Sequence, residues 1–401
     1  MSESILIDDF GPLPVRRPTS VSELCIFVKE AAASGQGVYP VGGRTTLDVG
    51  LPPIKPGFAL DTTALNQVID YPARDMTITV QAGITMAKLQ ETLAAEGQWL
   101  PVDVPNPEQT TIGGAVALNI SGPRRLGYGT LRDYVIGISF ATDEGNEVKA
   151  GGRVVKNVAG YDLMKLQVGA VGTLGVITQL TLKVKPKPES QAVIRMLCAE
   201  SELPSLLDRL HESKSRPVAV DVAADHSVVG AAWAIWAAFA EKAATVEWQI
   251  NTLLDEFKSA RVTDVTAERG PEAECRMRWL SESSAPSSSV VFKANVLPSA
   301  TAKFCNFAAG IQGLHIHAHA LNGIVIGSMN TDEDLDATVK VLAGRTGTGS
   351  GNLVIRRCPT AWKKSLPIWG KPGNDRDLMR RVKQTLDPQN VFNPGRLFGD
   401  M

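Results

Sequence analysis

The chain has 401 residues, 41 basic and 42 acidic, and a formal charge of −1 at pH 7. Its length predicts two or three domains. Its near-neutral charge does not indicate the excess of basic residues that is typical of nucleic-acid-binding proteins. The five scattered cysteines include no Cys-x-x-Cys pair, which argues against an iron–sulfur cluster or a zinc knuckle and indicates a reducing compartment. The acidic N-terminus has no signal-peptide pattern and the most apolar run, 228–240, is too short to span a bilayer, so we expect a cytoplasmic protein.

The first elements lead into a loop that begins with two glycines. Ser20 and Glu23 form a capping-box pattern ahead of apolar residues at helical spacing, which predicts a helix that Gly35 ends. A short strand over 38–41 then enters the loop 42–46, Gly-Gly-Arg-Thr-Thr. Successive backbone N–H groups in such a loop can bind phosphate oxygens. Because the loop matches neither the Walker nor the dinucleotide fingerprint, a tight turn is the alternative.

Two further loops rich in small and hydroxyl residues follow. Alternation over 76–82 predicts a half-buried strand, and apolar spacing over 86–93 predicts a helix. The proline-stiffened segment 101–107 is expected to be extended. It enters a loop over 110–115, and a similar loop over 121–129 continues the same character.

The stretch 151–185 is the densest in glycine and ends in a predicted strand over 176–184. It follows a predicted hairpin of strands 134–141 and 147–150. Glycine at this density lets the backbone approach a ligand closely, so we interpret the stretch as one wall of a site for a large flat ligand with a phosphate tail. A glycine-rich hairpin with only a turn role is the alternative. Loops of this kind recurring through the first 180 residues suit one extended dinucleotide better than unrelated turns.

The second half of the chain has weaker patterns. The sequence predicts a buried strand over 228–239, a helix over 241–257, a strand over 353–357 and a final helix over 378–386. The Gly/Thr/Ser segment 344–351 favours a turn over a phosphate site.

Three of the five histidines of the chain alternate with apolar residues in 314–320. Period-2 geometry places His315, His317 and His319 on one face of a strand. Three uses stay open for them: a metal site, a proton acceptor, or a structural strand edge. We assign no metal to this chain.

Taken together, several motifs resemble one family. Segments 41–46, 111–114, 121–125, 153–163 and 172–178 resemble the FAD-binding domain of the vanillyl-alcohol oxidase type (PCMH type), and the nearest likeness is the FAD-binding E subunit of bacterial glycolate oxidase. The C-terminal run, 387–396, is similar to the closing motif of that family. The resemblance is strong over 18–187 and patchy over 190–345.

The resemblance implies a fold and its divisions. We expect an α+β chain with a two-subdomain PCMH-type FAD-binding domain over 1–187. A cap or substrate domain over 188–360, α/β with an antiparallel sheet, should follow. The segment 361–401 should return to the FAD domain.

The resemblance also implies a cofactor site. The loop 42–46 would bind the pyrophosphate through backbone amides. The ribityl and flavin portions would be lined by Thr111, Gly113, Gly114, Ser121 and Gly122. The adenine and ribose would pack against Gly172, Gly175, Val176 and Ile177. Asn393 would return towards the flavin. Arg44 stands where some relatives attach FAD to a histidine, so noncovalent FAD is expected. The implied cofactor-binding residues are Val41, Gly42, Gly43, Arg44, Thr45, Thr46, Pro105, Thr111, Ile112, Gly113, Gly114, Ser121, Gly122, Gly172, Gly175, Val176, Ile177 and Asn393.

The implied activity is hydride transfer from a small 2-hydroxy acid, such as glycolate or D-lactate, to flavin N5. His317 or His319 would be the base, and Arg124 would grip the carboxylate, with Arg125, Arg356 and Arg357 as further candidates. Lys156 and Tyr161 would reach the flavin ring. Structural roles are the alternative for each of these residues.

The likeness to the E subunit further implies partners, namely a D-type flavoprotein and an iron–sulfur subunit, through which the chain would sit at the inner membrane. Two other functions stay open. One is an FAD-holding assembly subunit without turnover, and the other is an independent sugar or alcohol oxidase of the same fold.

Overall fold

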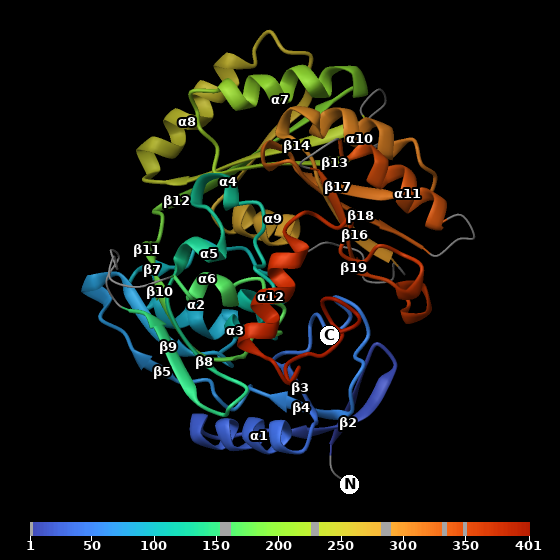
Figure 1. The fold of residues 1–401 in the computed structure, drawn as a ribbon. Coiled ribbons are helices and arrows are strands. Elements are labelled where there is room, and N and C mark those ends of the chain that lie inside the picture. Colours follow the sequence, from blue (N-terminus) through green and yellow to red (C-terminus); the bar gives the residue numbers. More distant parts are fainter. Residues whose placement is uncertain (1–2, 153–161, 226–231, 282–289, 331–334, 348–350) are drawn as a thin grey trace. The chain divides into compact units, whose positions relative to one another are not determined.

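The computed structural model describes residues 3–152, 162–225, 232–281, 290–330, 335–347 and 351–401 (Figure 1). The chain divides into two compact units. Unit 1 contains residues 1–120, 130–187 and 372–401, and unit 2 contains residues 121–129 and 188–371. The α+β class predicted from the sequence is confirmed.

The first sheet of unit 1 has the order β1-β2-β4-β3. Its strands are β1 (Ser4–Ile7), β2 (Phe10–Arg16), β3 (Gly37–Val41) and β4 (Gly57–Asp61). Strands β3 and β4 are parallel, and Leu24, Val28 and Ala31 of helix α1 (Val21–Ala33) share a buried core with Val38 and Phe58. The predicted start of this helix is confirmed, because the Ser20 hydroxyl accepts the Glu23 N–H at 3.2 Å.

The second sheet of unit 1 has the order β5-β6-β10-β8-β9. Its strands are β5 (Val68–Asp70), β6 (Thr77–Gln81), β8 (Val135–Ala141), β9 (Glu147–Gly151) and β10 (Val176–Lys183). The helices of this part are α2 (Met86–Ala94), α3 (Ile112–Ala117), α5 (Leu131–Tyr134) and α6 (Met164–Gln167), and a small ladder joins β7 (Gln98–Trp99) to β11 (Lys185–Pro186).

One loop predicted in this region is wrong. The segment 110–115 was expected to be irregular, but it begins helix α3. Thr111 is the N-cap, and its hydroxyl accepts the Gly114 N–H at 3.3 Å. A hydroxyl before a short apolar stretch is a helix start as well as a loop signal, and the two glycines obscured the helical pattern.

The C-terminal segment belongs to unit 1. After helix α12 (Arg376–Leu386), residues 391–393 run beside β3: the Val38 N–H donates to the Val391 carbonyl at 2.7 Å, and the Asn393 N–H donates to the Val38 carbonyl at 2.9 Å. The sequence predicts this return at residue 361, whereas in the structure it begins at Pro372. Residues before it stay with unit 2 because the Ile355 N–H of a unit 2 strand donates to the Ile368 carbonyl at 2.9 Å.

Unit 2 is built on an eight-stranded antiparallel sheet of order β15-β12-β14-β13-β17-β18-β16-β19. Its strands are β12 (Ser190–Cys198), β13 (Ala219–Ala224), β14 (Trp233–Glu241), β15 (Thr263–Arg269), β16 (Val290–Asn295), β17 (His315–His319), β18 (Ile324–Met329) and β19 (Asn352–Arg357). The antiparallel sheet expected for the second domain is thus confirmed.

The helices of unit 2 are α4 (Arg125–Tyr128), α7 (Leu203–Glu212), α8 (Ala243–Glu256), α9 (Pro271–Ser281), α10 (Thr301–Ala309) and α11 (Leu335–Arg345). Helix α9 packs Ala273 and Met277 against Leu197 and Trp236 of the sheet. Figure 1 shows α7 and α8 on the other side of the sheet from α9. Short 3-10 turns are η1 (Ala73–Asp75), η2 (Glu200–Glu202), η3 (Pro298–Ala300), η4 (Ala320–Asn322) and η5 (Thr360–Lys364).

Candidate cofactor pocket and substrate face

A pocket in unit 1 brings together three segments that are far apart in the sequence: the loop after β3, the start of α3, and the entry to β10. Asn393 and Arg396 of the C-terminal segment complete it. The residues predicted to bind the cofactor that line this pocket are Val41, Gly42, Gly43, Arg44, Thr45, Thr46, Thr111, Gly113, Gly114, Gly172, Gly175, Val176, Ile177 and Asn393.

The glycine pair in the first loop is required by the protein's own backbone. A Cβ on Gly42 would overlap the Thr111 hydroxyl, and one on Gly43 would overlap the Gln109 carbonyl oxygen. The segment 109–111 therefore packs directly on the loop. Within the described residues, the backbone N–H groups of 42–46 donate to no protein acceptor. They are available to a bound anion, which is the role that the sequence predicts for them.

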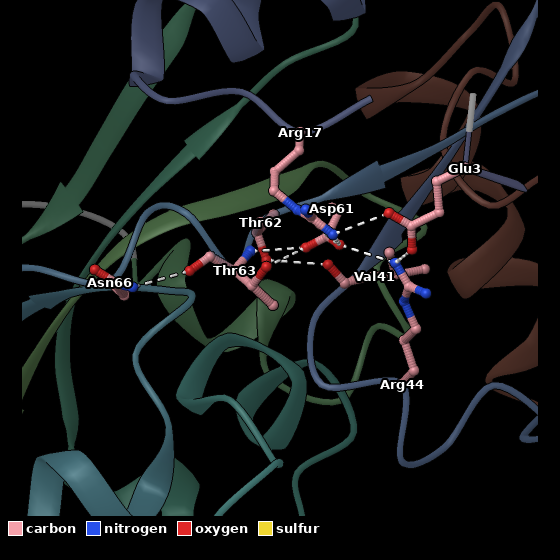
Figure 2. Close-up of polar contacts among 8 residues, drawn as sticks. All are labelled: Glu3, Arg17, Val41, Arg44, Asp61, Thr62, Thr63 and Asn66. Carbon is pink, nitrogen blue, oxygen red and sulfur yellow. Dashed lines mark hydrogen bonds and ion pairs between the residues drawn. The ribbon is translucent and has the colours of Figure 1, made fainter. Parts of the chain in front are cut away.

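Arg44 lines the pocket, and its side chain connects this loop to an ion-pair network. Its backbone has φ +59°, a conformation uncommon for a side chain other than glycine. Figure 2 shows its guanidinium directed towards Glu3 and Asp61, at 2.7 Å and 3.0 Å from their carboxylate oxygens. Arg17 also donates to Asp61, at 2.8 Å.

Asp61, at the end of β4, is the centre of the network and is almost fully buried. It accepts the Thr63 N–H at 2.9 Å and the Thr63 hydroxyl at 2.6 Å. Burial opposes its ionisation, but the hydrogen bonds from Thr63 and Arg17 outweigh it and lower the pKa of Asp61. The carboxylate therefore stays charged, and the charge of Arg44 is balanced inside the protein.

Several predicted cofactor residues do not line the pocket. The Pro105 carbonyl accepts the Thr110 hydroxyl at 2.8 Å, so Pro105 lies behind a lining residue. Ile112 is fully buried in the core. Ser121 and Gly122 belong to unit 2. The predicted catalytic residues Lys156 and Tyr161 lie outside the described residues.

Other residues line the pocket that were not predicted from the sequence. Ile7, Leu47, Val171 and Arg396 also face the pocket. Arg396 lies in the C-terminal motif 387–396, and Val171 directly precedes Gly172. The sequence therefore offered a reason to include both residues in the predicted site. It offered no such reason for Ile7, in the first strand.

In unit 2 the prediction for the histidine strand is confirmed. In β17, His315, His317 and His319 pair with Ser328, Ile326 and Ile324 of β18, so the three histidines share one face. Two of them meet a residue that sequence reasoning missed. Asp221 of β13 is fully buried and pairs with His319 in the sheet.

The Asp221 carboxylate joins the two histidines. Its oxygens lie 2.6 Å from His317 Nε2 and 3.0 Å from His319 Nδ1. Burial opposes ionisation of Asp221, but the positive charges that His319 and His317 can carry lower its pKa. Of the two histidines, His317 keeps more solvent exposure, at 17% against 4% for its side chain, so it is the one that a small molecule can reach.

The same three groups could hold a metal ion, since their ligand atoms all lie within 4.8 Å of one another. Their mutual hydrogen bonds also satisfy the buried carboxylate without one. The only signal for Asp221 in the sequence was an acidic residue inside an apolar run, Ala219–Ala224.

A second missed residue is Lys293, in the middle of β16. Lys293 pairs with Ile326, which pairs with His317, so the lysine and this histidine lie in one row on the same face of the sheet. Burial, followed by the positive charges of Arg356 and Arg125, lowers the pKa of Lys293 to about 8. No carboxylate among the described residues forms an ion pair with it.

The arginines proposed from sequence have different surroundings. Arg125 and Arg356 act electrostatically on Lys293. Arg124 donates instead to the Gln191 side chain at 3.0 Å. An unmatched, half-buried positive group close to two arginines is suited to bind a carboxylate.

Family models match two segments of the chain, which lie mostly in unit 1. Residues 12–151 match the model of the FAD binding domain, and residues 371–397 match that of the C-terminal domain of FAD linked oxidases. The chain therefore contains an FAD-binding domain of the PCMH type. FAD is therefore its cofactor, and the pocket of unit 1 contains the loops that the resemblance assigned to it.

Relatives of this FAD-binding chain include three named enzymes or subunits. D-2-hydroxyglutarate dehydrogenase of Xanthomonas citri pv. viticola is 25% identical, over 97% of this chain and 89% of the relative. Glycolate oxidase subunit GlcE of Escherichia coli is 35% identical over 41% of this chain. D-lactate dehydrogenase of Anaerostipes hadrus is 37% identical over 43% of this chain. The matched segments span 46% of GlcE and 36% of the D-lactate dehydrogenase.

Among solved structures, an alkyldihydroxyacetonephosphate synthase superposes with a TM-score of 0.68 at 18% identity, covering 95% of this chain and 75% of that one. This likeness supports the fold alone. Among the helices that the structure describes, none has the length and apolar character needed to cross a membrane.

Proposed function

We propose that the chain oxidises a small 2-hydroxy acid, such as glycolate or D-lactate, to the 2-oxo acid. FAD is assigned to unit 1 and the acid to the histidine face of unit 2. The observation that carries the proposal is that His317, a proton acceptor, and the positive group of Lys293 lie in one row on the same sheet face. No carboxylate among the described residues pairs with this lysine. The names of the relatives, which include dehydrogenases of D-lactate and D-2-hydroxyglutarate, support the substrate class.

Each group on this face has a task in the proposal. The ammonium group of Lys293, with Arg356 and Arg125, binds the carboxylate of the acid. His317 takes the proton of the 2-hydroxyl group as the C2–H bond breaks. Asp221 orients the imidazole and stabilises the charge that His317 gains. Bound FAD supplies the acceptor for the hydride that leaves C2.

The FAD is proposed to be bound noncovalently, because Arg44 occupies the position where some relatives attach the flavin to a histidine. The Arg44 guanidinium is engaged by Glu3 and Asp61. Acid precipitation should leave all flavin absorbance in the supernatant. Flavin that stays with the washed pellet would contradict this part of the proposal.

The electrons need an acceptor outside the chain. None of the five cysteines forms a disulfide, and they are scattered along the sequence without the spacing of an iron–sulfur motif. We propose that a D-type flavoprotein and an iron–sulfur subunit are partners, on the basis of the similarity to GlcE. Co-purification from cells that express all three subunits at native levels would test this arrangement.

One alternative is an FAD-holding subunit that turns over no acid, which the same similarity to GlcE favours. The test is anaerobic addition of glycolate, D-lactate and D-2-hydroxyglutarate to the FAD-loaded chain. We expect one of these acids to bleach the flavin absorbance. If dithionite bleaches it and none of the acids does, the proposal fails and the assembly role remains. Rapid oxygen consumption with a sugar or an alcohol would instead indicate an independent oxidase.

A further inference from the structure

The C-terminal segment contacts the backbone of the loops that form the cofactor pocket. Residues 383–396 rejoin unit 1 after the whole of unit 2 has been made. Lys383, Asn393 and Arg396 project from this segment, and each donates to backbone carbonyls of the loops that wall the FAD pocket. Lys383 and Arg396 are almost completely buried.

Arg396 organises the chain that follows the phosphate loop. Its guanidinium donates to the carbonyls of Leu51 at 2.8 Å, Leu47 at 2.5 Å, and Val49. It also forms an ion pair with Asp8. In return, the Leu51 N–H donates to the Arg396 carbonyl at 2.9 Å.

These contacts engage the four N–H donors on the two Nη atoms of Arg396. The side chain lines the pocket, but it cannot donate through those groups to a phosphate without breaking a bond to the protein. Arg396 therefore stabilises the backbone conformation of residues 47–51. A lysine in its place offers a point charge and cannot reproduce the planar fork.

Asn393 braces the opposite wall. Its side-chain amide donates to the Val171 carbonyl at 2.7 Å. Val171 has φ +56° and Gly172 has φ +64°. A β-branched residue in the left-handed region is strained, and such a conformation persists only where its surroundings impose it. Asn393 is one of those restraints, and it contacts this wall where it lines the cofactor pocket.

Lys383 fixes the next residue of the same wall. Its ammonium group donates to the Thr173 carbonyl and the Phe392 carbonyl, each at 2.9 Å, and pairs with Asp387. The three donors of the lysine are thus all used. Asp387 in turn accepts the N–H groups of Val391 and Phe392 at 2.8 Å each.

We propose that residues 383–396 form a C-terminal latch that sets the shape of the FAD pocket. Arg396 positions the wall that contains the phosphate loop, while Asn393 and Lys383 position the wall at 171–173. The three are positioning residues, because these donors bond to the protein's own carbonyls. The latch concerns FAD affinity and is independent of which acid, if any, the chain oxidises.

The test uses the full chain with Arg396→Lys, which keeps the charge opposite Asp8. We expect FAD to bind about tenfold more weakly or worse, from the loss of hydrogen bonds made by a charged group. We also expect faster amide hydrogen exchange confined to residues 47–51. Arg381→Lys is the matched control, because Arg381 is an exposed arginine on α12, and it should change neither quantity.

A second variant separates the two walls. Asn393→Leu removes the donor to Val171 and should speed exchange at 171–173 while leaving 47–51 unchanged. The proposal is overturned if both variants bind FAD like the parent. It is also overturned if exchange rises throughout unit 1 in both variants, because that pattern would indicate general loss of stability instead of two separately braced walls.

Discussion

The two units offer different groups to negatively charged ligands, namely backbone N–H groups in unit 1 and charged side chains in unit 2. Unit 1 presents backbone: the N–H groups of 42–46 donate to no acceptor in the part of the chain that the structure describes. The nearby charges of Arg44 and Arg396 are balanced by carboxylates of the protein. Unit 2 presents side chains: the pKa of Lys293 is lowered to about 8, and no carboxylate among the described residues pairs with it. The pocket for FAD therefore depends on shape, and the proposed acid site depends on ionisable groups.

This difference has a physical reason. A large cofactor that stays bound can be recognised over many weak contacts with a rigid loop. A small acid offers few atoms, so a charged group in a half-buried site must supply both affinity and specificity. Substitutions in the two units should consequently fail in different ways: added volume should harm unit 1, and altered charge should harm unit 2.

The largest effect is expected from Gly43→Ala. The added methyl group would overlap the Gln109 carbonyl, which is part of the backbone and cannot rotate away. FAD content after reconstitution, measured as flavin absorbance relative to protein, should fall to near zero. Gly152→Ala is the control, since no atom of the described residues lies within 4 Å of the position its methyl group would take. A Gly43→Ala chain that binds FAD normally would refute the shape argument for unit 1.

The next largest effect is expected from His317→Asn. Loss of a general base should slow anaerobic flavin reduction by about 10²- to 10⁴-fold. FAD content should stay the same, because the residue belongs to unit 2. His315→Asn is the matched control, as His315 shares the face of the strand and lies outside the pair that contacts Asp221. Equal rates in the two variants would remove His317 from the mechanism.

A smaller effect is expected from Lys293→Met, which keeps much of the side-chain volume and removes the charge. The acid should bind about 10- to 100-fold more weakly, as expected for losing a hydrogen bond to a charged group. The rate of flavin reduction at saturating acid should change much less. Lys303→Met on α10 is an exposed control. Unchanged affinity for the acid in Lys293→Met would place the carboxylate elsewhere.

The smallest effect is the dependence of acid binding on pH. The pKa of Lys293 is about 8, depressed chiefly by burial. The lysine is charged below this pH and neutral above it, whereas a 2-hydroxy acid is ionised throughout. The KM should therefore be flat below pH 8 and rise above it, by about tenfold for each pH unit at most. A rise that persists unchanged in Lys293→Met would show that another group titrates.

Part of this molecule could be predicted from sequence because the signals are local. Ser20 and Glu23 start a helix through contacts three residues apart, and the alternation at 315–319 puts the histidines on one face before any partner strand is known. The glycine-rich loops, through their resemblance to one family, identified the cofactor. Where local signals conflicted, as at Thr111 and the glycines after it, the predicted loop was wrong because a helix cap and a turn use the same residues.

The sequence by itself therefore determined the cofactor, the fold class and the face that the histidines occupy. Only the tertiary structure decided which residues meet there. Asp221 lies 96 residues before His317 in the chain, and Lys293 shares the row of His317 only through the register of β18 between their strands. Likewise, Arg396 braces Leu51 across 345 residues. Strand order and register fix such pairs, and these depend on how the whole sheet packs rather than on any short stretch of residues.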